Sequence, residues 1–369
     1  MKPLKIAILG RYRNKSANGV DRTIAGHIFG LAEEGHKVTL LTVESPGKAE
    51  TEELARSGIS LCVITASSIF FVFSILRLRG KFDLLWLHSV FTLRNWIAFS
   101  LLGCPWITTP NGGYSPGQIR YKSRLFKKLA LLVVERRMIR NALFVHTLTE
   151  TESSDVKHLN AKARTVIAMN GCETEPYEPV RFNDNDCTIR FLFIGRISVV
   201  HKGLDLLITA LESVPKTTPW RLDIVGKGSD TDTEALSLQI KQKNLESKVT
   251  LKGLLFGNDK QEILSSCHVF VHTSRWEGMP FSIIESMCAS RPVLITTGTN
   301  MGKFVTQHDT GWVADISAES IANSLNEILR SGQDVIVQKS KNAHSASKLY
   351  LTWDSVMAPI FDELRTIHD

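Results

Sequence analysis

The stretch CHVFVHTSRWEGMPFSIIESM, residues 267–287, joins a short apolar run, an acidic turn with one glycine and a helical segment. This order is typical of a strand–helix unit in a parallel sheet. The turn places Glu277 eight positions before Glu285. Ionised carboxylates are strong acceptors, so the pair suits a hydroxyl-rich ligand. The plainer alternative is a glutamate near a helix start and a second, solvated glutamate, because this spacing arises by chance in many helices.

The same strand–helix rhythm runs through the whole chain of 369 residues, a length that favours two domains. Apolar runs such as LKIAILG and KVTLLTV alternate with helical segments in the first half, and a second series begins at IRFLFIGRI. We predict an α/β protein with two Rossmann-like, doubly wound parallel domains that face a cleft. The first domain is expected over residues 1–175 and the second over 176–351, with a helix at about 352–369 packing back on the first.

Composition narrows the class of protein. Hydrophobic residues make up 43% and charged residues 22%, which is ordinary globular composition. The six cysteines form no C-x-x-C pair, the N-terminus lacks a signal-peptide pattern, and the apolar run SSIFFVFSIL is about half the length that a membrane span needs. We therefore expect a cytoplasmic protein with no transmembrane helix.

The ends of strands in the second half carry groups suited to phosphate. Gly195 and Arg196 follow the run FLFI, and Lys202 stands just before a predicted helix. The positive charge of a lysine opposes the helix dipole at this end, unless an anion lies nearby. An arginine fork and a lysine ammonium could clamp a diphosphate. The alternative is two surface cations beside a helix start, but a nearby anion explains a lysine at that place better. Gly226, after LDIV, allows a close backbone approach, as it also would in any ordinary turn.

Residues 278–281 strengthen the case for an anion at this edge. Gly278 permits a close approach, Met279 follows it, Pro280 suits the first helical position, and the amides from Phe281 onward open a helix. A helix N-terminus binds anions because its first N–H groups have no partners within the helix.

Taken in order, FIGRISVVHKGLDLLI, LDIVGKGS and VFVHTSRWEGMPFSIIESMCASRPVLIT resemble the retaining glycosyltransferases of family 4, which have the GT-B fold. NGVDRTIAGHIFGLAEEGHKVTLLT, near the start, is similar to the family's glycine loop, first helix and following strand. The resemblance covers nearly the whole chain.

The resemblance implies roles for particular residues. Arg196 and Lys202 match the pair that binds the donor diphosphate, Glu277 the glutamate near the donor sugar, and Glu285 the one that binds the ribose. The backbone of Gly278, Met279, Pro280 and Phe281 would hold sugar and phosphate beside Gly195 and Gly226, and Gly19 matches the loop glycine near the donor phosphates. The chain departs from the family where many members carry a histidine, because that position is Asn111, and where the usual glycine pair is reduced to Asn18-Gly19.

Two further features bear on the site. His88 ends the strand DLLWLHS, where it could be a cleft residue or a structural one, and we group it with Asn111 as a candidate acceptor or sugar contact. The D-x-D patterns Asp184/Asp186 and Asp230/Asp232 are interpreted as solvated loops. We expect no metal, because Arg196, Lys202 and helix dipoles would neutralise the diphosphate.

The resemblance implies transfer of a hexose-type sugar, with retention, from a UDP- or GDP-sugar to a hydroxyl of a glycan or lipid-linked acceptor. Cell-envelope polysaccharide, lipopolysaccharide or glycolipid synthesis is the expected setting. The alternative is a GT-B protein that transfers nothing, either a nucleotide-sugar epimerase or a silent binder.

Positive charge is concentrated in the first half, where residues 1–180 carry 24 Lys and Arg against 15 Asp and Glu. Within residues 120–140 eight cations accompany only Glu135. Leu125, Phe126, Leu129, Leu132 and Val133 would form an apolar stripe that could meet an anionic membrane at the inner face of the cytoplasmic membrane, bury itself in the first domain, or do both. Nucleic-acid binding is not expected, since the segment has few aromatics for stacking.

Overall fold

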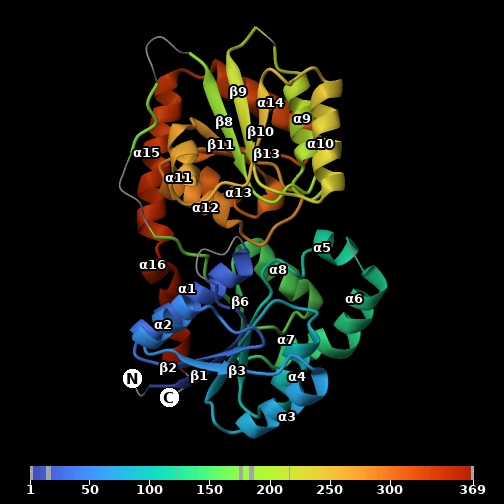
Figure 1. Cartoon of the computed structure of the whole chain (residues 1–369), viewed down its shortest axis with the longest axis vertical. Coiled ribbons are helices and arrows are strands. Elements are labelled where there is room, and N and C mark those ends of the chain that lie inside the picture. The colour runs from blue at the N-terminus through green and yellow to red at the C-terminus, as the bar shows by residue number, and fades with distance from the viewer. Residues whose placement is uncertain are drawn as a thin grey trace. The chain divides into compact units, whose positions relative to one another are not determined.

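The computed structural model describes residues 3–13, 18–121, 123–173, 178–182, 187–215 and 217–366. The chain divides into two compact units, one formed by Met1–Gly171 with Trp353–Asp369 and the other by Cys172–Thr352. Each unit contains one parallel sheet with helices on both faces (Figure 1). The predicted pair of Rossmann-like domains is confirmed.

The first unit is built on a seven-stranded parallel sheet in the order β3-β2-β1-β4-β5-β6-β7. Its strands are β1 (Lys5–Leu9), β2 (Lys37–Thr42), β3 (Ser60–Val63), β4 (Leu84–His88), β5 (Trp106–Thr109), β6 (Phe144–Thr147) and β7 (Thr165–Ile167). Its helices are α1 (Gly19–Glu33), α2 (Lys48–Arg56), α3 (Ser68–Leu78), α4 (Leu93–Leu101), α5 (Pro116–Arg120), α6 (Arg124–Ala130), the π-helix η1 (Leu131–Glu135), α7 (Arg136–Asn141), α8 (Glu150–Leu159) and α16 (Trp353–Arg365).

Alternation along β1 explains why this sheet is covered on both faces. Ile6 and Ile8 belong to a core that α1 and α16 complete, whereas Ala7 and Leu9 belong to a second core shared with α3, α4 and α7. Successive strand residues point to opposite faces, so an almost wholly apolar strand must be buried twice.

The second unit has a six-stranded parallel sheet in the order β10-β9-β8-β11-β12-β13. Its strands are β8 (Ile189–Ile194), β9 (Trp220–Val225), β10 (Val249–Gly253), β11 (Val269–His272), β12 (Val293–Thr296) and β13 (Gly311–Ala314). Its helices are α9 (Leu204–Glu212), α10 (Asp230–Gln242), α11 (Gly257–Ser266), α12 (Phe281–Cys288), the 3-10 helix η2 (Thr297–Thr299), α13 (Gly302–Gln307), α14 (Ala318–Arg330) and α15 (Gln333–Tyr350).

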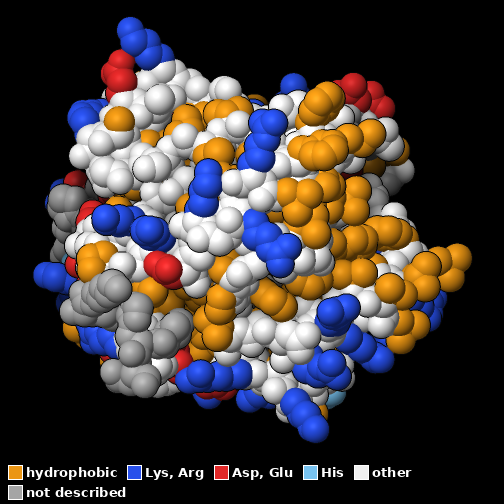
Figure 2. Space-filling model, turned by 90° about the horizontal axis from the view of Figure 1, so that it is seen from below, with side chains coloured by type: hydrophobic (Ala, Val, Ile, Leu, Met, Phe, Trp, Pro, Cys, Tyr) orange, Lys and Arg blue, Asp and Glu red, His pale blue; other side chains and the backbone are white. Residues whose placement is uncertain are grey.

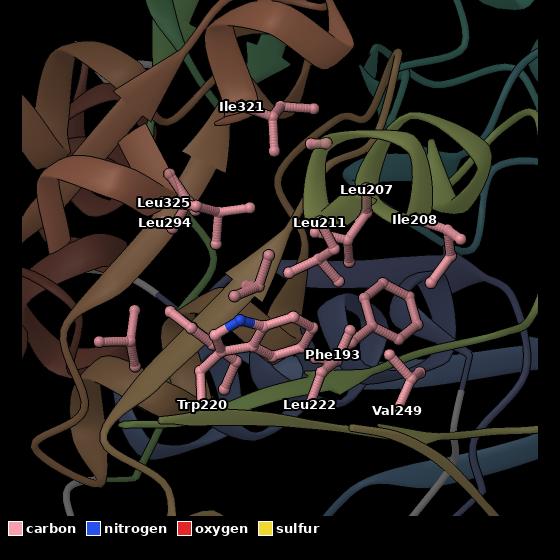
Figure 3. Close-up of a cluster of buried hydrophobic side chains, with 14 of the residues drawn as sticks. Phe193, Leu207, Ile208, Leu211, Trp220, Leu222, Val249, Leu294, Ile321 and Leu325 are labelled. Atoms are coloured by element: carbon pink, nitrogen blue, oxygen red, sulfur yellow. The ribbon is translucent and has the colours of Figure 1, made fainter. Parts of the chain in front are cut away.

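One core of this second sheet lies under α9 and α14. Leu207, Ile208 and Leu211 of α9 point toward Phe193 and Leu222 of the strands, with Trp220 and Val249 alongside (Figure 3). This packing fixes where α9 begins, and so it places the residues just before the helix at the carboxyl end of β8.

One expectation for a particular segment is wrong. Asp230 and Asp232 are not in a solvated loop but in the first turn of α10, where Asp232 accepts a hydrogen bond from the Val199 amide at 3.1 Å. Negative charge is favourable at a helix N-terminus, which gives these carboxylates a structural role. Asp184 and Asp186 lie outside the described residues.

The basic stretch at residues 120–140 is built from several short helical segments. It consists of α5, α6, η1 and α7 in succession, and the π-helix η1 interrupts the helical hydrogen bonding. Glu135, the one acid among these cations, is fully buried.

Trp353, at the start of α16, provides a test of how this helix packs. A Cβ added at Gly26 of α1 would come within 2.1 Å of the Trp353 ring, and one at Gly171 within 2.6 Å. Glycine is therefore required at Gly26 although it lies inside a helix, where alanine is normally favoured by about 1 kcal/mol.

We predict that Gly26→Ala lowers the free energy of unfolding by about 1–3 kcal/mol, the usual cost of overpacking. The matched control is Gly30→Ala in the same helix, because a Cβ at that position would meet its nearest atom, Met357 Cγ, only at 3.4 Å, an ordinary van der Waals contact. Thermal unfolding of both variants makes the comparison, and an unchanged melting temperature for Gly26→Ala would contradict the packing described.

Candidate functional site

The candidate donor site lies in the second unit, at the carboxyl ends of β8, β9 and β11. The turns after β8 and β9 touch directly, since a Cβ at Gly226 would lie 1.8 Å from the Gly195 carbonyl oxygen and Gly226 has a φ of +153°. Only glycine allows this approach. The predicted glycines therefore bring two backbone turns together at this edge of the sheet.

Lys202 and Glu277 form the centre of this site. The Lys202 Nζ lies 2.5 Å from Glu277 Oε1, and only 13% and 14% of the two side chains are exposed. Ser274 donates its hydroxyl to the same oxygen at 2.8 Å. Every described contact of the Glu277 carboxylate is to Oε1, so the other oxygen retains its acceptor capacity.

Two histidines that the sequence analysis did not identify face the same carboxylate. The Nε2 atoms of His201 and His272 each lie 3.6 Å from Glu277 Oε1. His272 is fully buried, and its Nε2 is too far away for a hydrogen bond and has no other partner among the described residues.

The charges of the site follow from burial and from Lys202. Burial alone would raise the pKa of Glu277, but Lys202 and the neighbouring histidines hold that pKa well below its usual range. Burial lowers the pKa of His272 to about 4 and also lowers that of His201. At neutral pH the centre is therefore one buried ion pair flanked by two uncharged imidazoles.

Backbone contacts hold the turn that carries Glu277. Asn300 donates its side-chain amide to the Glu277 carbonyl at 2.7 Å, and the Thr296 hydroxyl donates to the Ser274 carbonyl at 2.6 Å. Both come from the end of β12 and the short η2 segment. The carboxylate is thus positioned by residues that the motif itself does not include.

The opposite side of the pair is held by β11. Thr273 donates its hydroxyl to the carbonyls of Lys202 and Gly203, both at 3.1 Å. A Cβ at Gly203 would come within 2.0 Å of the Thr273 carbonyl oxygen. The first turn of α9 is therefore pressed against the end of β11, which brings Lys202 to Glu277.

Arg196 follows β8 and is exposed. Its described contact is with His201, whose Nδ1 lies 3.5 Å from the Arg196 Nη2. Arg196 shares the β8–α9 turn with Lys202, but the structure holds the two cations differently. Lys202 is bound in the buried pair, whereas the Arg196 guanidinium remains open to solvent.

Glu285 lies in α12, beyond the turn formed by Gly278, Met279, Pro280 and Phe281. Met279, Pro280 and Phe281 are buried, and Pro280 precedes the first helical residue. Glu285 pairs with Lys260 of α11, at 2.9 and 3.1 Å to its two oxygens. The two glutamates of the motif thus have different cation partners, and the sequence analysis identified Lys202 but not Lys260.

Predicted contacts in the first unit have varied surroundings. Gly19 is the first residue of α1, and its carbonyl accepts a hydrogen bond from Thr23 at 3.1 Å. Asn111 has a positive φ of 53° and donates to the Thr109 carbonyl at 3.1 Å. Next to it, the Gly112 amide donates to the buried Glu152 at 2.5 Å, a contact that the sequence did not indicate.

His88 is buried among aromatic and imidazole rings. It stacks on Trp86, and its Nε2 lies 3.4 Å from the Nδ1 of His27, with His146 in the same group. Burial lowers the pKa of His88 to about 3. It is therefore uncharged at neutral pH and forms part of the packing at the end of β4.

Two family models match the chain. One is described as "Glycosyl transferases group 1" and matches residues 179–347, and the other as "Glycosyl transferase 4-like domain" and matches residues 18–171. The chain belongs to the glycosyltransferases with the GT-B fold.

Particular relatives of this glycosyltransferase differ in how much they share with it. One component of the human phosphatidylinositol N-acetylglucosaminyltransferase is 22% identical over 353 residues, which are 90% of this chain and 71% of the relative. The poly(ribitol-phosphate) alpha-N-acetylglucosaminyltransferase of Staphylococcus aureus is 38% identical over 104 residues, but these are only 27% of this chain and 20% of that protein. HepE from Anabaena, solved in complex with UDP and glucose, has a TM-score of 0.76 at 18% identity and covers 98% of this chain and 100% of its own.

Metal sites and membrane spans are both missing from the described part of this glycosyltransferase. Within the described ranges no three His, Cys, Asp or Glu side chains gather in a way that could hold a metal ion. Among the same residues, no helix is both long and apolar enough to cross a bilayer.

The buried pair generates a prediction about stability and pH. Lys202→Met should lower the free energy of unfolding by about 3 kcal/mol at neutral pH, because it leaves Glu277 buried without its cation. The depressed pKa means that the contribution of Glu277 is present above its ordinary value of 4.5 and is lost as the pH falls through the folded value. In the variant, burial raises this pKa instead, so the deficit should shrink as the pH falls toward 4.5.

Thermal unfolding of wild type and variant between pH 7.5 and pH 4.5 measures the effect. Lys241→Met, at an exposed position of α10, is the control. A deficit that does not change with pH would show that Lys202 contributes by packing rather than by charge.

Proposed function

We propose that this protein transfers a hexose-type sugar from a nucleotide-diphosphate donor to a hydroxyl of a glycan or lipid-linked acceptor, with retention of anomeric configuration. The observation that carries the proposal is the buried Lys202–Glu277 pair at the carboxyl edge of the second sheet. Family membership supports the reaction class. Ligands of open α/β sheets bind at this edge of the strands.

The proposed donor would meet complementary charges along the site. Its diphosphate would lie between the exposed Arg196 and Lys202, near the amides that open α12. Lys202 would then share its charge between phosphate and Glu277. Glu277 Oε2, which has no described contact, would accept hydrogen bonds from sugar hydroxyls. This division assigns the cation to the leaving group and the carboxylate to the sugar.

Preorganisation is the proposed source of catalysis. Cations and amides already in place stabilise the charge that develops on a leaving diphosphate without reorganising at the moment of reaction. Because His201 and His272 are uncharged at neutral pH, they would add no second positive charge next to Glu277. We propose that this electrostatic arrangement serves without a metal, and that the enzyme functions in the cytoplasm, which its scattered cysteines support.

At the ribose end, the proposal must account for Lys260. Glu285 would accept the ribose hydroxyls while Lys260 neutralises its charge. HepE was solved with UDP and glucose, which favours a uracil nucleotide here. The human relative named for phosphatidylinositol favours a lipid-linked acceptor, for synthesis of glycolipid or cell-envelope glycan.

The first experiment is a thermal-shift panel of UDP, GDP, ADP and their common sugars on wild type, Glu285→Ala and Lys260→Met. A ligand at 100 times its Kd adds about 2.7 kcal/mol, a shift of a few degrees. We expect one base to stabilise wild type and to stabilise Glu285→Ala less. Arg221→Ala, an exposed cation of β9, is the control. No shift with any nucleotide would contradict the proposal and favour a GT-B scaffold that does not bind these nucleotides.

Activity tests the roles of the cations. Arg196→Ala and Lys202→Ala should each reduce the transfer rate about 100- to 1,000-fold, the usual loss for one group that stabilises developing charge. Product anomers identified by NMR test retention, and assays with EDTA test metal independence. Rates near wild type in both variants would refute the diphosphate assignment, and an epimer formed from donor alone would replace transfer by epimerisation.

A further inference from the structure

The first unit exposes two apolar helix faces that its core does not use. On α3, Phe71 and Ile75 are buried, but Ile69, Phe70, Phe73 and Leu76 are 68%, 62%, 58% and 41% exposed. Their spacing of i, i+1, i+4 and i+7 places them on one face of the helix. The core of the first unit therefore covers one apolar face of α3 and leaves the other exposed to solvent.

The second face belongs to α6 and the π-helix η1. Leu125, Phe126, Leu129, Leu132 and Val133 are between 52% and 83% exposed. The core instead receives Ala130 and Leu131, together with residues of α7. The expectation that this stripe could bury itself in the first domain is therefore wrong, because other residues of the same segment cover the sheet.

The two faces are linked by α4. This helix packs on α3, and its Trp96 ring lies 6.0 Å from the ring of Phe126 in α6. Leu93 at the beginning of α4 is 56% exposed and lines a cavity of about 310 Å³ together with Phe71, Arg94 and Ile97. Seen from below, a broad hydrophobic area appears with Lys and Arg side chains at its margins (Figure 2). Patches of this extent on a soluble domain mark interaction sites.

Charge identifies the partner. The segments 68–82 and 93–141 contain a single Asp or Glu, Glu135, and that residue is fully buried. The exposed cations of these segments include Arg77, Arg94, Arg124, Lys128, Arg136 and Arg137, and none has a carboxylate partner among the described residues. We propose that α3, the start of α4, α6 and η1 form a docking surface for an anionic phospholipid bilayer.

Buried Glu135 explains how this surface is held. Its carboxylate accepts from the Phe91 amide and the Trp96 indole, each at 2.7 Å, and from the Tyr114 hydroxyl at 2.5 Å. These donors follow β4 and β5, at the carboxyl edge of the first sheet. Glu135 faces inward at the end of the π-helix, so the exposed charges of this segment are all cations. Its hydrogen bonds tie the surface to the loops at that edge.

Other partners fit the surface less well. A second copy of the chain, docked about a two-fold axis, would bring like charges together across the contact with no acids to pair them. Nucleic acid would satisfy the cations, but aliphatic Leu125, Leu129 and Leu132 provide no stacking platform. A bilayer accepts the apolar groups among its acyl chains and the cations among its phosphates.

The test is flotation of the full chain with vesicles of phosphatidylcholine alone and of phosphatidylcholine mixed with phosphatidylglycerol. We expect wild type to float with the anionic vesicles and about tenfold less with the neutral ones. Phe70→Ser/Phe73→Ser, Leu129→Ser/Leu132→Ser and Arg124→Ala/Lys128→Ala should each reduce the floated fraction about tenfold. Because these side chains are exposed, the variants should unfold at the wild-type temperature.

Matched controls lie in the second unit. The double variant Leu238→Ser/Leu349→Ser removes two exposed leucines. The double variant Arg221→Ala/Lys241→Ala removes two exposed cations. Both controls should float as wild type does. Lys202→Met should also float normally, which separates this proposal from the donor site. The proposal would be overturned if wild type floated equally with both vesicle types, or if the three double variants of the docking surface floated like the controls. It would also be overturned if light scattering showed a dimer that those double variants dissociate.

Discussion

The second unit depends on one electrostatic constraint, namely that Lys202 and Glu277 are both removed from most of the solvent. Charges in such a place must satisfy each other, because neither has enough water to do so. The pair therefore determines how closely the start of α9 approaches the turn before α12. Thr273 and Asn300 secure the backbones on either side, so both loops stand in one arrangement before any ligand arrives.

The surroundings of this pair decide what it can do. His201 and His272 stay uncharged because burial opposes their protonation, which keeps Lys202 as the single positive charge on the carboxylate. A negatively charged ligand would compete with Glu277 for that lysine. The result is a site whose cation is already desolvated and directed, rather than one that must collect a mobile side chain from solution.

In the first unit a buried carboxylate organises the surface in a comparable way. Glu135 collects donors from the loops after β4 and β5 and from α4. Turning inward, it removes the one negative charge from a strongly basic segment. Glu135 ends the π-helix, and the apolar stripe of α6 and η1 is exposed while this acid is buried. Single-turn π segments often accompany functional sites.

Much of this molecule could be predicted from local patterns. Apolar runs between turn residues located the parallel strands, because strands buried on both faces must be apolar throughout. Gly226 was predicted as a close-approach position from its place after a strand. Arg196, Lys202 and Glu277 were predicted at one edge, because parallel strands end together at the same side of a sheet. The resemblance to a family then connected them with a donor diphosphate and sugar.

Contacts between distant segments could not be predicted in this way. Lys260 pairs with Glu285 across two helices, and His201 reaches Glu277 from the turn before α9, far earlier in the chain. Asp232 was expected in a solvated loop, and the burial of Glu135 was not foreseen, since nothing local shows which donors will reach these carboxylates. The sequence by itself determined the strands, the fold class and the chemical types at the strand ends, because these follow from periodicity and turn chemistry. Only the tertiary structure decided which charges are paired and buried and which apolar helix faces remain exposed, because burial depends on every segment that packs nearby.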